Sequence, residues 1–302
     1  MATTAEWVAV DWGTSNVRAW GIAGDGSTVF STGSDKGMGR IGRADFPGVL
    51  DELIGVQMAG PAEVVICGMA GARQGWREAP YLDTPADLHR LNAGSVRPEG
   101  ADARFDVRIL PGVCQRQPGH EDVMRGEETQ LLGLLHLQPG FSGTAVLPGT
   151  HSKWAEIRDG KLVRFSSAMT GELYELFAEH SVLRHALTGD RTGPATEEGL
   201  GEGIEAGLGR PDMLTSLVFR TRAAGLLSAK GSDWCSGYLS GLLIATEVAG
   251  HRDWLDGAPV PLVGSERLSR TYGAALKRLG IESLPIDAAN ATIEGLKGAR
   301  TQ

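Results

Sequence analysis

The chain has 302 residues, of which 41% are hydrophobic, enough for one large domain or for two lobes that each bury a core. Its net charge of −8 argues against a general binder of nucleic acid, and its 43 glycines are too many for a helical bundle. The three cysteines form no CxxC pair and are expected to be reduced thiols. The sequence shows no signal-peptide pattern and no membrane-spanning stretch, which predicts a cytoplasmic protein without a membrane partner.

A glycine-bearing hairpin is predicted near the start of the chain. Val8 and Val10 indicate a buried strand, and residues 17–22 indicate a second strand that follows a tight turn. The turn contains an acid, a glycine and three small polar residues: Asp11, Gly13, Thr14, Ser15 and Asn16. Its N–H groups could approach a phosphate, and a carboxylate at a strand end usually meets phosphates through Mg²⁺. An ordinary turn with a hydroxyl-rich loop is the alternative.

The segment 36–42 matches the GxGxxG pattern but does not predict a dinucleotide site. No strand directly precedes it, and Pro47 and Gly48 interrupt the segment that follows. A loop with Lys36 and Arg40 is either a substrate-side loop or a solvated connector. A helix is expected over 49–58 and a buried strand over 64–67.

Small residues 68–71 follow that strand, with Arg73 and Trp76 beyond them. Residues 78–106 are rich in Pro, Asp and Arg and predict irregular surface structure, followed by a strand over 107–110. A helix is expected from Gly126 to about Leu137. Its two leading acids, Glu127 and Glu128, are typical of a helix start because they oppose the helix dipole.

A second glycine-hydroxyl turn follows the strand predicted over 144–147. It runs from Pro148 to Trp154, and a hairpin over 154–166 continues from it. Gly149 permits close approach to an anion, while Thr150, Ser152 and Lys153 are donors. The order of strand, turn and strand repeats that of residues 7–22. This internal echo predicts two related lobes, each presenting a hairpin tip.

The C-terminal half is predicted to be largely helical. Apolar residues at three- and four-residue spacing indicate helices over 172–187, 200–208, 213–227, 232–255, 269–279 and 288–296. Gly237, Gly241 and Ala245 form a small-residue stripe that favours close helix packing. A strand over 261–263 leads into the turn at Gly264 and Ser265. No zinc motif and no GxxxxGK[ST] loop are present, which excludes a P-loop kinase.

Six segments together resemble the 2-dehydro-3-deoxygalactonokinase family. They are Asp11–Asn16, Gly68–Gly71, Met124–Gln130, Pro148–Trp154, Met169–Leu173 and Tyr238–Leu243. The resemblance extends from about residue 7 to residue 296. It implies an α/β actin-like ATPase fold, related to ribonuclease H, of two lobes around a cleft. Each lobe would carry a mixed five-stranded sheet flanked by helices. The lobes are expected at 1–112 and 113–302, with a helix over 287–298 packing back on the first.

The resemblance implies ATP-dependent phosphorylation of the terminal 6-hydroxyl of 2-dehydro-3-deoxy-D-galactonate, in galactonate catabolism. The sequence leaves the C4 epimer, 2-dehydro-3-deoxygluconate, as an alternative acceptor. An ATP or polyphosphate hydrolase, or a nucleotide-dependent conformational protein of the same fold, are further alternatives. The expected partners are a small-molecule sugar acid, ATP and Mg²⁺, with no nucleic acid.

The resemblance also implies roles for individual residues. The hairpin at 11–16 and the loop at 149–153 would hold the ATP phosphates, with Asp11 near Mg²⁺. Gly264 and Ser265 would border the adenosine, and segments 68–71 and 291–295 would form a hinge. The catalytic base would be Glu127 or Glu128, although the family's wider relatives usually carry Asp there. The candidates for binding the sugar acid are Lys36, Arg73, Arg125, Thr170 and Glu172.

Overall fold

The structure, a computed structural model, describes residues 4–58, 60–188 and 193–301. The contacts divide the chain into two compact units. The first unit comprises residues 1–142, 157–164 and 288–302, and the second comprises residues 143–156 and 165–287. The first unit therefore extends past the boundary expected at residue 112 and includes the C-terminal helix. Among the described residues, no helix is long and apolar enough to cross a membrane.

The first unit contains a five-stranded mixed sheet. Its strands are β1 (Trp7–Trp12), β2 (Val17–Ile22), β3 (Thr28–Ser34), β4 (Ala62–Gly68) and β7 (Phe105–Ile109), in the order β3-β2-β1-β4-β7. The β1–β2 and β2–β3 pairs are antiparallel, whereas β4 runs parallel to β1 and to β7. In this register Asp11 lies between Arg18 and Cys67. The strand ends therefore bring the predicted hairpin tip next to the glycine-rich end of β4.

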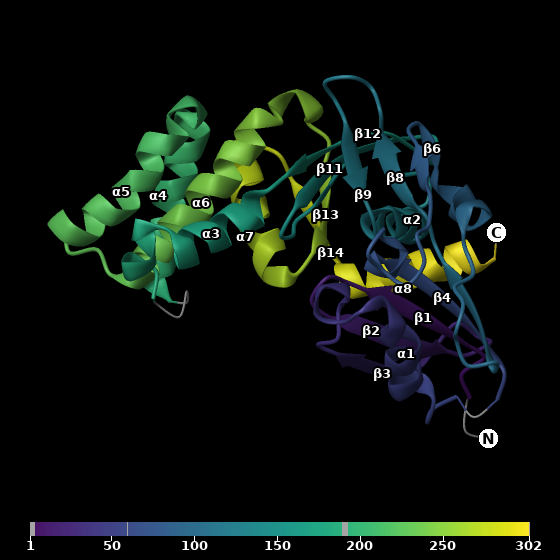
Figure 1. The fold of residues 1–302 in the computed structure, drawn as a ribbon. Helices are drawn as coiled ribbons and strands as arrows, with labels where there is room; N and C mark the ends of the chain where they lie inside the picture. The colour runs from purple at the N-terminus through teal and green to yellow at the C-terminus, as the bar shows by residue number, and fades with distance from the viewer. Residues whose placement is uncertain (1–3, 59, 189–192, 302) are drawn as a thin grey trace. The chain divides into compact units, whose positions relative to one another are not determined.

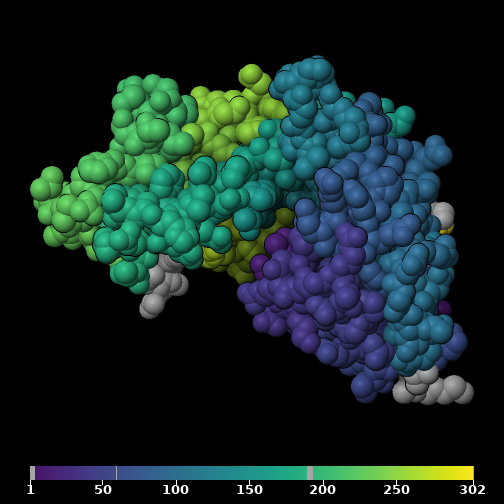
Figure 2. All heavy atoms as spheres, viewed as in Figure 1, coloured from purple at the N-terminus to yellow at the C-terminus, as the bar shows by residue number. Residues whose placement is uncertain are grey.

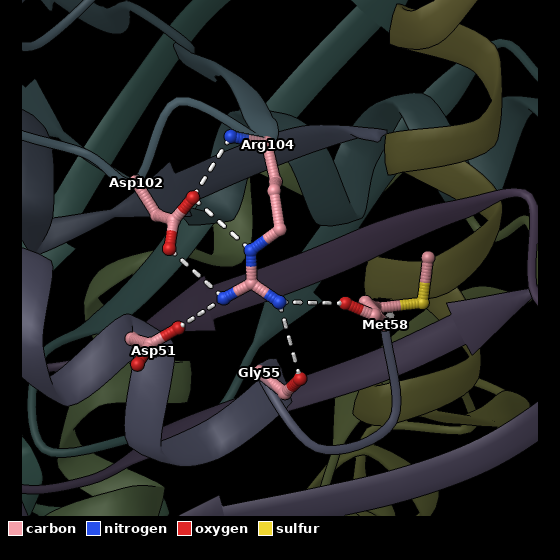
Figure 3. Close-up of polar contacts among 5 residues, drawn as sticks. All are labelled: Asp51, Gly55, Met58, Asp102 and Arg104. Carbon is pink, nitrogen blue, oxygen red and sulfur yellow. Dashed lines mark hydrogen bonds and ion pairs between the residues drawn. The ribbon is translucent and has the colours of Figure 1, made fainter. Parts of the chain in front are cut away.

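Helix α1 (Phe46–Ile54) covers this sheet and is held at its C-terminal end by Arg104. The Arg104 guanidinium donates to the carbonyl oxygens of Gly55 and Met58 and to the carboxylates of Asp51 and Asp102 (Figure 3). These bonds satisfy carbonyl groups that the end of a helix leaves without partners. Beneath α1, the rings of Trp12 and Phe46 pack with centroids 4.7 Å apart.

Residues 78–106 are more ordered than their composition predicts. They contain β5 (Tyr81–Asp83), β6 (Ala86–Asp87) and the 3₁₀ segment η4 (Leu88–Gly94), in which Leu88 and Leu91 are fully buried. β5 forms a small sheet with β8 (Gly112–Gln115) and β9 (Asp122–Met124), in the order β5-β8-β9. The strands are so short that no alternating pattern could develop in the sequence. The remaining short 3₁₀ segments of this unit are η1 (Met38–Arg40), η2 (Arg43–Asp45) and η3 (Met69–Gly71).

Two helices of the first unit cross at glycines. Helix α2 (Glu127–Leu137) packs on α8 (Ala288–Arg300), the C-terminal helix. A Cβ atom at Gly133 would lie 1.8 Å from the Ala291 carbonyl oxygen, and one at Gly295 would lie 1.9 Å from that of Thr129. The two backbones are therefore as close as helices can come, which requires glycine on both.

The sheet of the second unit repeats the strand order of the first. Its strands are β10 (Gly143–Leu147), β11 (Ser152–Arg158), β12 (Lys161–Ala168), β13 (Val260–Gly264) and β14 (Ser283–Asp287). With β6, which pairs antiparallel to β12, this sheet has six strands in the order β14-β13-β10-β11-β12-β6, one more than the five expected, and β13 is parallel to both β10 and β14. Strands β10, β11 and β12 correspond to β1, β2 and β3 of the first sheet, and β13 and β14 correspond to β4 and β7. The internal echo seen in the sequence is thus confirmed, and so is the α/β class.

The helices of the second unit form its larger part, in teal to yellow-green in Figures 1 and 2. They are α3 (Thr170–His180), α4 (Pro194–Gly209), α5 (Leu214–Leu227), α6 (Ser232–Gly250) and α7 (Glu266–Arg278), with 3₁₀ segments η5 (Val182–Ala186), η6 (Pro211–Met213) and η7 (Arg252–Trp254). Glycines line the contact between α4 and α6. A Cβ atom at Gly203 would lie 2.2 Å from the Tyr238 carbonyl oxygen, and one at Gly237 would lie 2.1 Å from that of Thr196. The predicted small-residue stripe of α6 is therefore a close-packing face.

Two elements differ from the sequence prediction for identifiable reasons. The helix expected over 172–187 ends at His180, because the Ser181 hydroxyl accepts from the Leu183 N–H and starts a separate turn, η5. Strand β14 was not predicted at all. It is an edge strand that contains Pro285, and proline inside a run of strand-forming residues conceals the strand.

Candidate active site

The first predicted phosphate hairpin forms a tight turn that the 36–42 loop supports. The Gly13 N–H donates to the Asn16 carbonyl at 2.8 Å, and the side chains of Thr14, Ser15 and Asn16 are exposed. The loop at 36–42 packs against this tip, with the Gly39 N–H donating to the Thr14 carbonyl at 2.8 Å. A Cβ atom at Gly37 would lie 2.3–2.5 Å from backbone atoms of residues 14–16. The loop is therefore a brace for the hairpin and not a solvated connector.

The Lys36 side chain points away from the hairpin. Its ammonium group forms an ion pair with Glu52 of α1, while its carbonyl oxygen accepts from the Trp12 indole at 3.2 Å. The ammonium group of this candidate substrate residue is therefore already paired with a carboxylate of α1.

An acidic cluster lies where β1, β4 and the start of α2 meet. Gly68 ends β4 with φ +88°, and Gly126 precedes α2 with φ +110°; a Cβ atom on Gly126 would lie 3.4 Å from the Gly68 Cα. This close approach brings Glu127 near Asp11. Burial, together with the negative charge of Glu127, raises the pKa of Asp11 to about 6, and the positive charge of Arg18 opposes this shift.

The two adjacent glutamates occupy different environments. Glu128 is fully buried, and its carboxylate accepts from the Gly126 N–H at 2.7 Å and from the Thr129 hydroxyl at 3.0 Å. Burial and the neighbouring charge of Glu127 raise the pKa of Glu128 to about 7. Glu127 is only half-buried, and its carboxylate accepts from the Arg125 N–H at 3.1 Å. Of the two, only Glu127 has solvent access.

Arg125 is held flat against an aromatic ring beside these acids. Its guanidinium carbon lies 4.3 Å from the centre of the Tyr81 ring, and its Nη2 donates to the Ala79 carbonyl at 2.9 Å. Among the described residues, its Nε and Nη1 atoms have no hydrogen-bond partner although both are buried. Both atoms are enclosed, with Nη1 facing Gly71, so they would reach a ligand only after the side chain or its surroundings shift.

The other candidate arginine belongs to a loop that is braced but exposed. Arg73 is exposed, and its carbonyl oxygen accepts from the guanidinium of Arg43. Arg43 also donates to the Gly75 carbonyl at 2.9 Å, so it fixes the loop that follows β4.

Carboxylate oxygens are the metal-binding groups that this part of the first unit offers. The described residues contain no cluster of three or more His, Cys, Asp or Glu able to hold a metal ion by themselves. Burial and the charges of Asp11 and Glu128 hold the pKa of the Cys67 thiol well above its usual value. Asp11 fits a Mg²⁺ ion that takes its remaining ligands from phosphates and water.

In the second unit, the loop 148–151 is packed against the start of α3. The Glu172 N–H donates to the Thr150 carbonyl at 3.0 Å, and a Cβ atom at Gly171 would lie 2.5 Å from the Gly149 carbonyl oxygen. The Thr150 side chain is exposed, and the His151 ring contacts the Glu172 carboxylate. Glu172, a candidate for sugar hydroxyls, is thus engaged by a histidine of the loop.

Three further candidates of this unit lie inside it. Ser152 is fully buried, Lys153 is 5% exposed and donates to the Ser167 hydroxyl at 2.6 Å, and Thr170 is 8% exposed. The hydroxyls of Ser152 and Thr170 donate to the carboxylate of Glu247 on α6. These side chains hold the base of the loop, and the exposed side chains of the loop are those of Thr150 and His151.

A cavity of about 220 Å³ opens beside the 148–151 loop. It is lined by residues of the loop, of α3, α4, α6 and of α7, including Gly149, Thr170, Gly237, Ile244, Arg267 and Tyr272. Gly264 and Ser265, the predicted adenosine residues, directly precede helix α7, which forms one wall of the cavity. Ser265 caps α7 by accepting from the Leu268 N–H at 3.4 Å, and Gly264 packs against Pro148. The α7 side chains one to two turns further on line the cavity.

Sequence reasoning missed Glu247 and Tyr272. Glu247 interrupts a long and largely buried helix, and an acid on a buried helix face signals a buried hydrogen-bond network. Tyr272 gives no comparable signal, because a tyrosine in an amphipathic helix is ordinary.

Comparison with known proteins gives a consistent result. The sequence model of the 2-keto-3-deoxy-galactonokinase family matches residues 11–299. A protein of Rhizobium meliloti (strain 1021), designated a probable 2-dehydro-3-deoxygalactonokinase, is 40% identical over 99% of this chain and 98% of its own length. The 2-dehydro-3-deoxygalactonokinase of Escherichia coli (strain K12) is 33% identical over 97% of each chain. A crystal structure from Sinorhizobium meliloti, described as that of a putative 2-dehydro-3-deoxygalactonokinase, superimposes with a TM-score of 0.88 at 40% identity. The match covers 97% of this chain and 95% of the other.

Proposed function

The chain belongs to the 2-keto-3-deoxy-galactonokinase family, and from that premise we propose how its residues carry out phosphoryl transfer. It has the actin-like ATPase fold and is a phosphotransferase that acts on an alcohol group, a 2-dehydro-3-deoxygalactonokinase of galactonate degradation. As a kinase it uses ATP. The acceptor that we propose is the terminal hydroxyl of the sugar acid, which is the least hindered alcohol of such a molecule.

Glu127 is the general base in this proposal. The carrying observation is that Glu127 is half-buried beside Asp11, whereas Glu128 is enclosed and already accepts two hydrogen bonds. A base must come within hydrogen-bond reach of the attacking hydroxyl, and only a carboxylate open to the ligand can do so. Glu128 then serves as the internal support that fixes the Gly126 turn.

In this proposal each unit carries phosphate donors of its own. In the first unit, the N–H groups of residues 13–16 and the exposed hydroxyls of Thr14 and Ser15 would donate to phosphate oxygens. In the second unit, Gly149 and Thr150 would do the same, and the adjacent cavity would take the adenosine. Such donors act by positioning and by neutralising charge, which is most of what phosphoryl transfer asks of a protein.

Asp11 would hold Mg²⁺, directly or through water. When bound, the ion supplies positive charge against the phosphate oxygens. The raised pKa of Asp11 supports this role, because a carboxylate buried beside another acid is the kind of group that a cation stabilises in its charged form.

Arg125 would bind the carboxylate of the sugar acid. Its stacking on Tyr81 and its place directly beside Glu127 support this assignment, because a guanidinium that is already held in one position loses little freedom on binding. Arg73, exposed on the braced loop, could add a second positive charge. Lys36 is paired with Glu52, and this argues for a lesser role.

The test compares two isosteric variants. Glu127→Gln should lower kcat for ATP-dependent phosphorylation of 2-dehydro-3-deoxygalactonate by roughly 10²–10⁴-fold, while ADP still binds. Glu128→Gln should keep most of its turnover, because its carboxylate does not reach the ligand. Running both on the galactonate-derived acid and its C4 epimer also fixes the preferred acceptor. The opposite ranking of the two variants would assign the base to Glu128.

A further inference from the structure

Glu247 is a buried acid in the last turn of the largely apolar helix α6, and all of its acceptor sites are used. It is 7% exposed. Its Oε1 accepts from the Ser152 hydroxyl at 2.8 Å and from the Trp154 indole at 2.7 Å. Its Oε2 accepts from the Tyr272 hydroxyl at 2.8 Å and from the Thr170 hydroxyl. Two oxygens with four donors leave no lone pair of this carboxylate unused.

The four donors come from three different elements around the 148–151 loop. Ser152 and Trp154 belong to β11, which begins directly after the loop. Thr170 begins α3, and the next residue, Gly171, packs on Gly149. Tyr272 lies on α7. Thr170 and Tyr272 also line the cavity. Glu247 therefore links the strand that follows the loop and the helix on which the loop packs to the wall of the cavity.

Stability alone is a weak explanation for this arrangement. Burying a carboxylate costs several kcal/mol, and hydrogen bonds at best offset that cost, so apolar residues of similar size often do as well. What a saturated carboxylate does provide is direction, because each donor must lie along one lone pair. The charge of Glu247 together with burial raises the pKa of Tyr272 well above its usual value, so Tyr272 stays a donor.

We propose that Glu247 is a positioning residue for nucleotide binding: it holds the 148–151 loop, the first turn of α3 and the α7 wall of the cavity in one arrangement. This rests on the proposed function, in which the loop and the cavity take the phosphates and the adenosine. Glu247 does not touch the nucleotide itself. It acts through Ser152, Thr170 and Tyr272.

Glu247→Gln tests this with little change of shape. The amide has one acceptor oxygen and two N–H donors, so at least two of the four donors lose their acceptor. Calorimetric titration with ADP should show affinity reduced about tenfold, the effect of losing hydrogen bonds to a charged group. The KM for ATP should rise in parallel while the KM for the sugar acid stays within about twofold. Tyr272→Phe removes one donor only and should give a smaller effect in the same direction.

Leu239→Val is the matched control, because Leu239 is fully buried in the same helix but belongs to a different hydrophobic cluster from Trp154 and Tyr272. It should lower thermal stability without changing ADP affinity. Unchanged ADP affinity in Glu247→Gln, or an equal loss in Leu239→Val, would overturn the positioning role. If Glu247→Gln does not fold, Thr170→Val and Tyr272→Phe carry the test, and unchanged ADP affinity in both overturns it. Wild-type protein that binds no ADP would instead refute the proposed function.

Discussion

Replacing Gly203 by alanine should lower the free energy of unfolding, because the steric cost at the contact between α4 and α6 exceeds the gain from alanine's higher helix propensity. A Cβ atom there would lie 2.2 Å from the Tyr238 carbonyl oxygen and 2.8 Å from the Leu242 nitrogen. An ordinary contact needs about 3.4 Å or more, so the two helices must move apart by about 1 Å, which forfeits a quarter to a half of the dispersion energy across the contact. Overpacking of this kind costs about 1–3 kcal/mol, occasionally more.

Gly201 of the same helix gives the matched control, since a Cβ atom there meets nothing within 4 Å. In a helix interior, alanine is favoured over glycine by about 0.5–1 kcal/mol. Gly201→Ala should therefore be slightly stabilising, and Gly203→Ala should be destabilising by about 2 kcal/mol after the same gain is subtracted.

Urea denaturation followed by circular dichroism measures both variants against the wild type. The expected gap between them is about 3 kcal/mol in the free energy of unfolding. Equal stability of the two variants would refute the argument, because it would mean that the α4–α6 contact can widen at no cost. The same variants should differ in ADP binding, since Leu200, Gly237 and Ile244 line the cavity between these helices.

Two further outcomes follow from the acidic cluster and its neighbour. Because the pKa of Glu128 rises from 4.5 to about 7 on folding, the stability this group contributes is fully present below pH 4.5 and is lost as the pH rises through 7. Glu128→Gln should therefore gain about 3 kcal/mol relative to wild type between pH 4 and pH 8 in urea titrations, and a constant difference would contradict the shift. Arg125→Met should raise the KM for the sugar acid about tenfold or more with the KM for ATP unchanged, as measured by steady-state kinetics; an unchanged KM for the acid would assign its carboxylate to another residue.

Local patterns in the sequence were sufficient for the framework of the fold. The strand pairs around the turns at Gly13 and Gly149 could be predicted because their hydrophobic runs and turn residues lie within a few positions of each other. The repeated order of these elements also predicted the two related sheets. The start of α2 at Glu127 followed from the glycine and acids that precede it.

Features that depend on distant residues could not be predicted in this way. Nothing near Arg125 in sequence indicates that Tyr81 lies under its guanidinium, and nothing near Gly37 indicates that it braces the turn at 14–16. Ser152 looks like a loop hydroxyl, yet its orientation depends on Glu247, which lies 95 positions further along the chain. The distinction between Glu127 and Glu128 likewise depends on the close approach of Gly126 to Gly68.

The discontinuous course of the first unit has a consequence for biosynthesis. Its sheet is complete by residue 109, but α2 finds its glycine-matched partner only in α8, the final helix. In a nascent chain leaving the ribosome, the face of α2 that packs on α8 therefore stays uncovered while the whole second unit emerges. A helix that is translated after the whole second unit therefore closes the unit that was begun first.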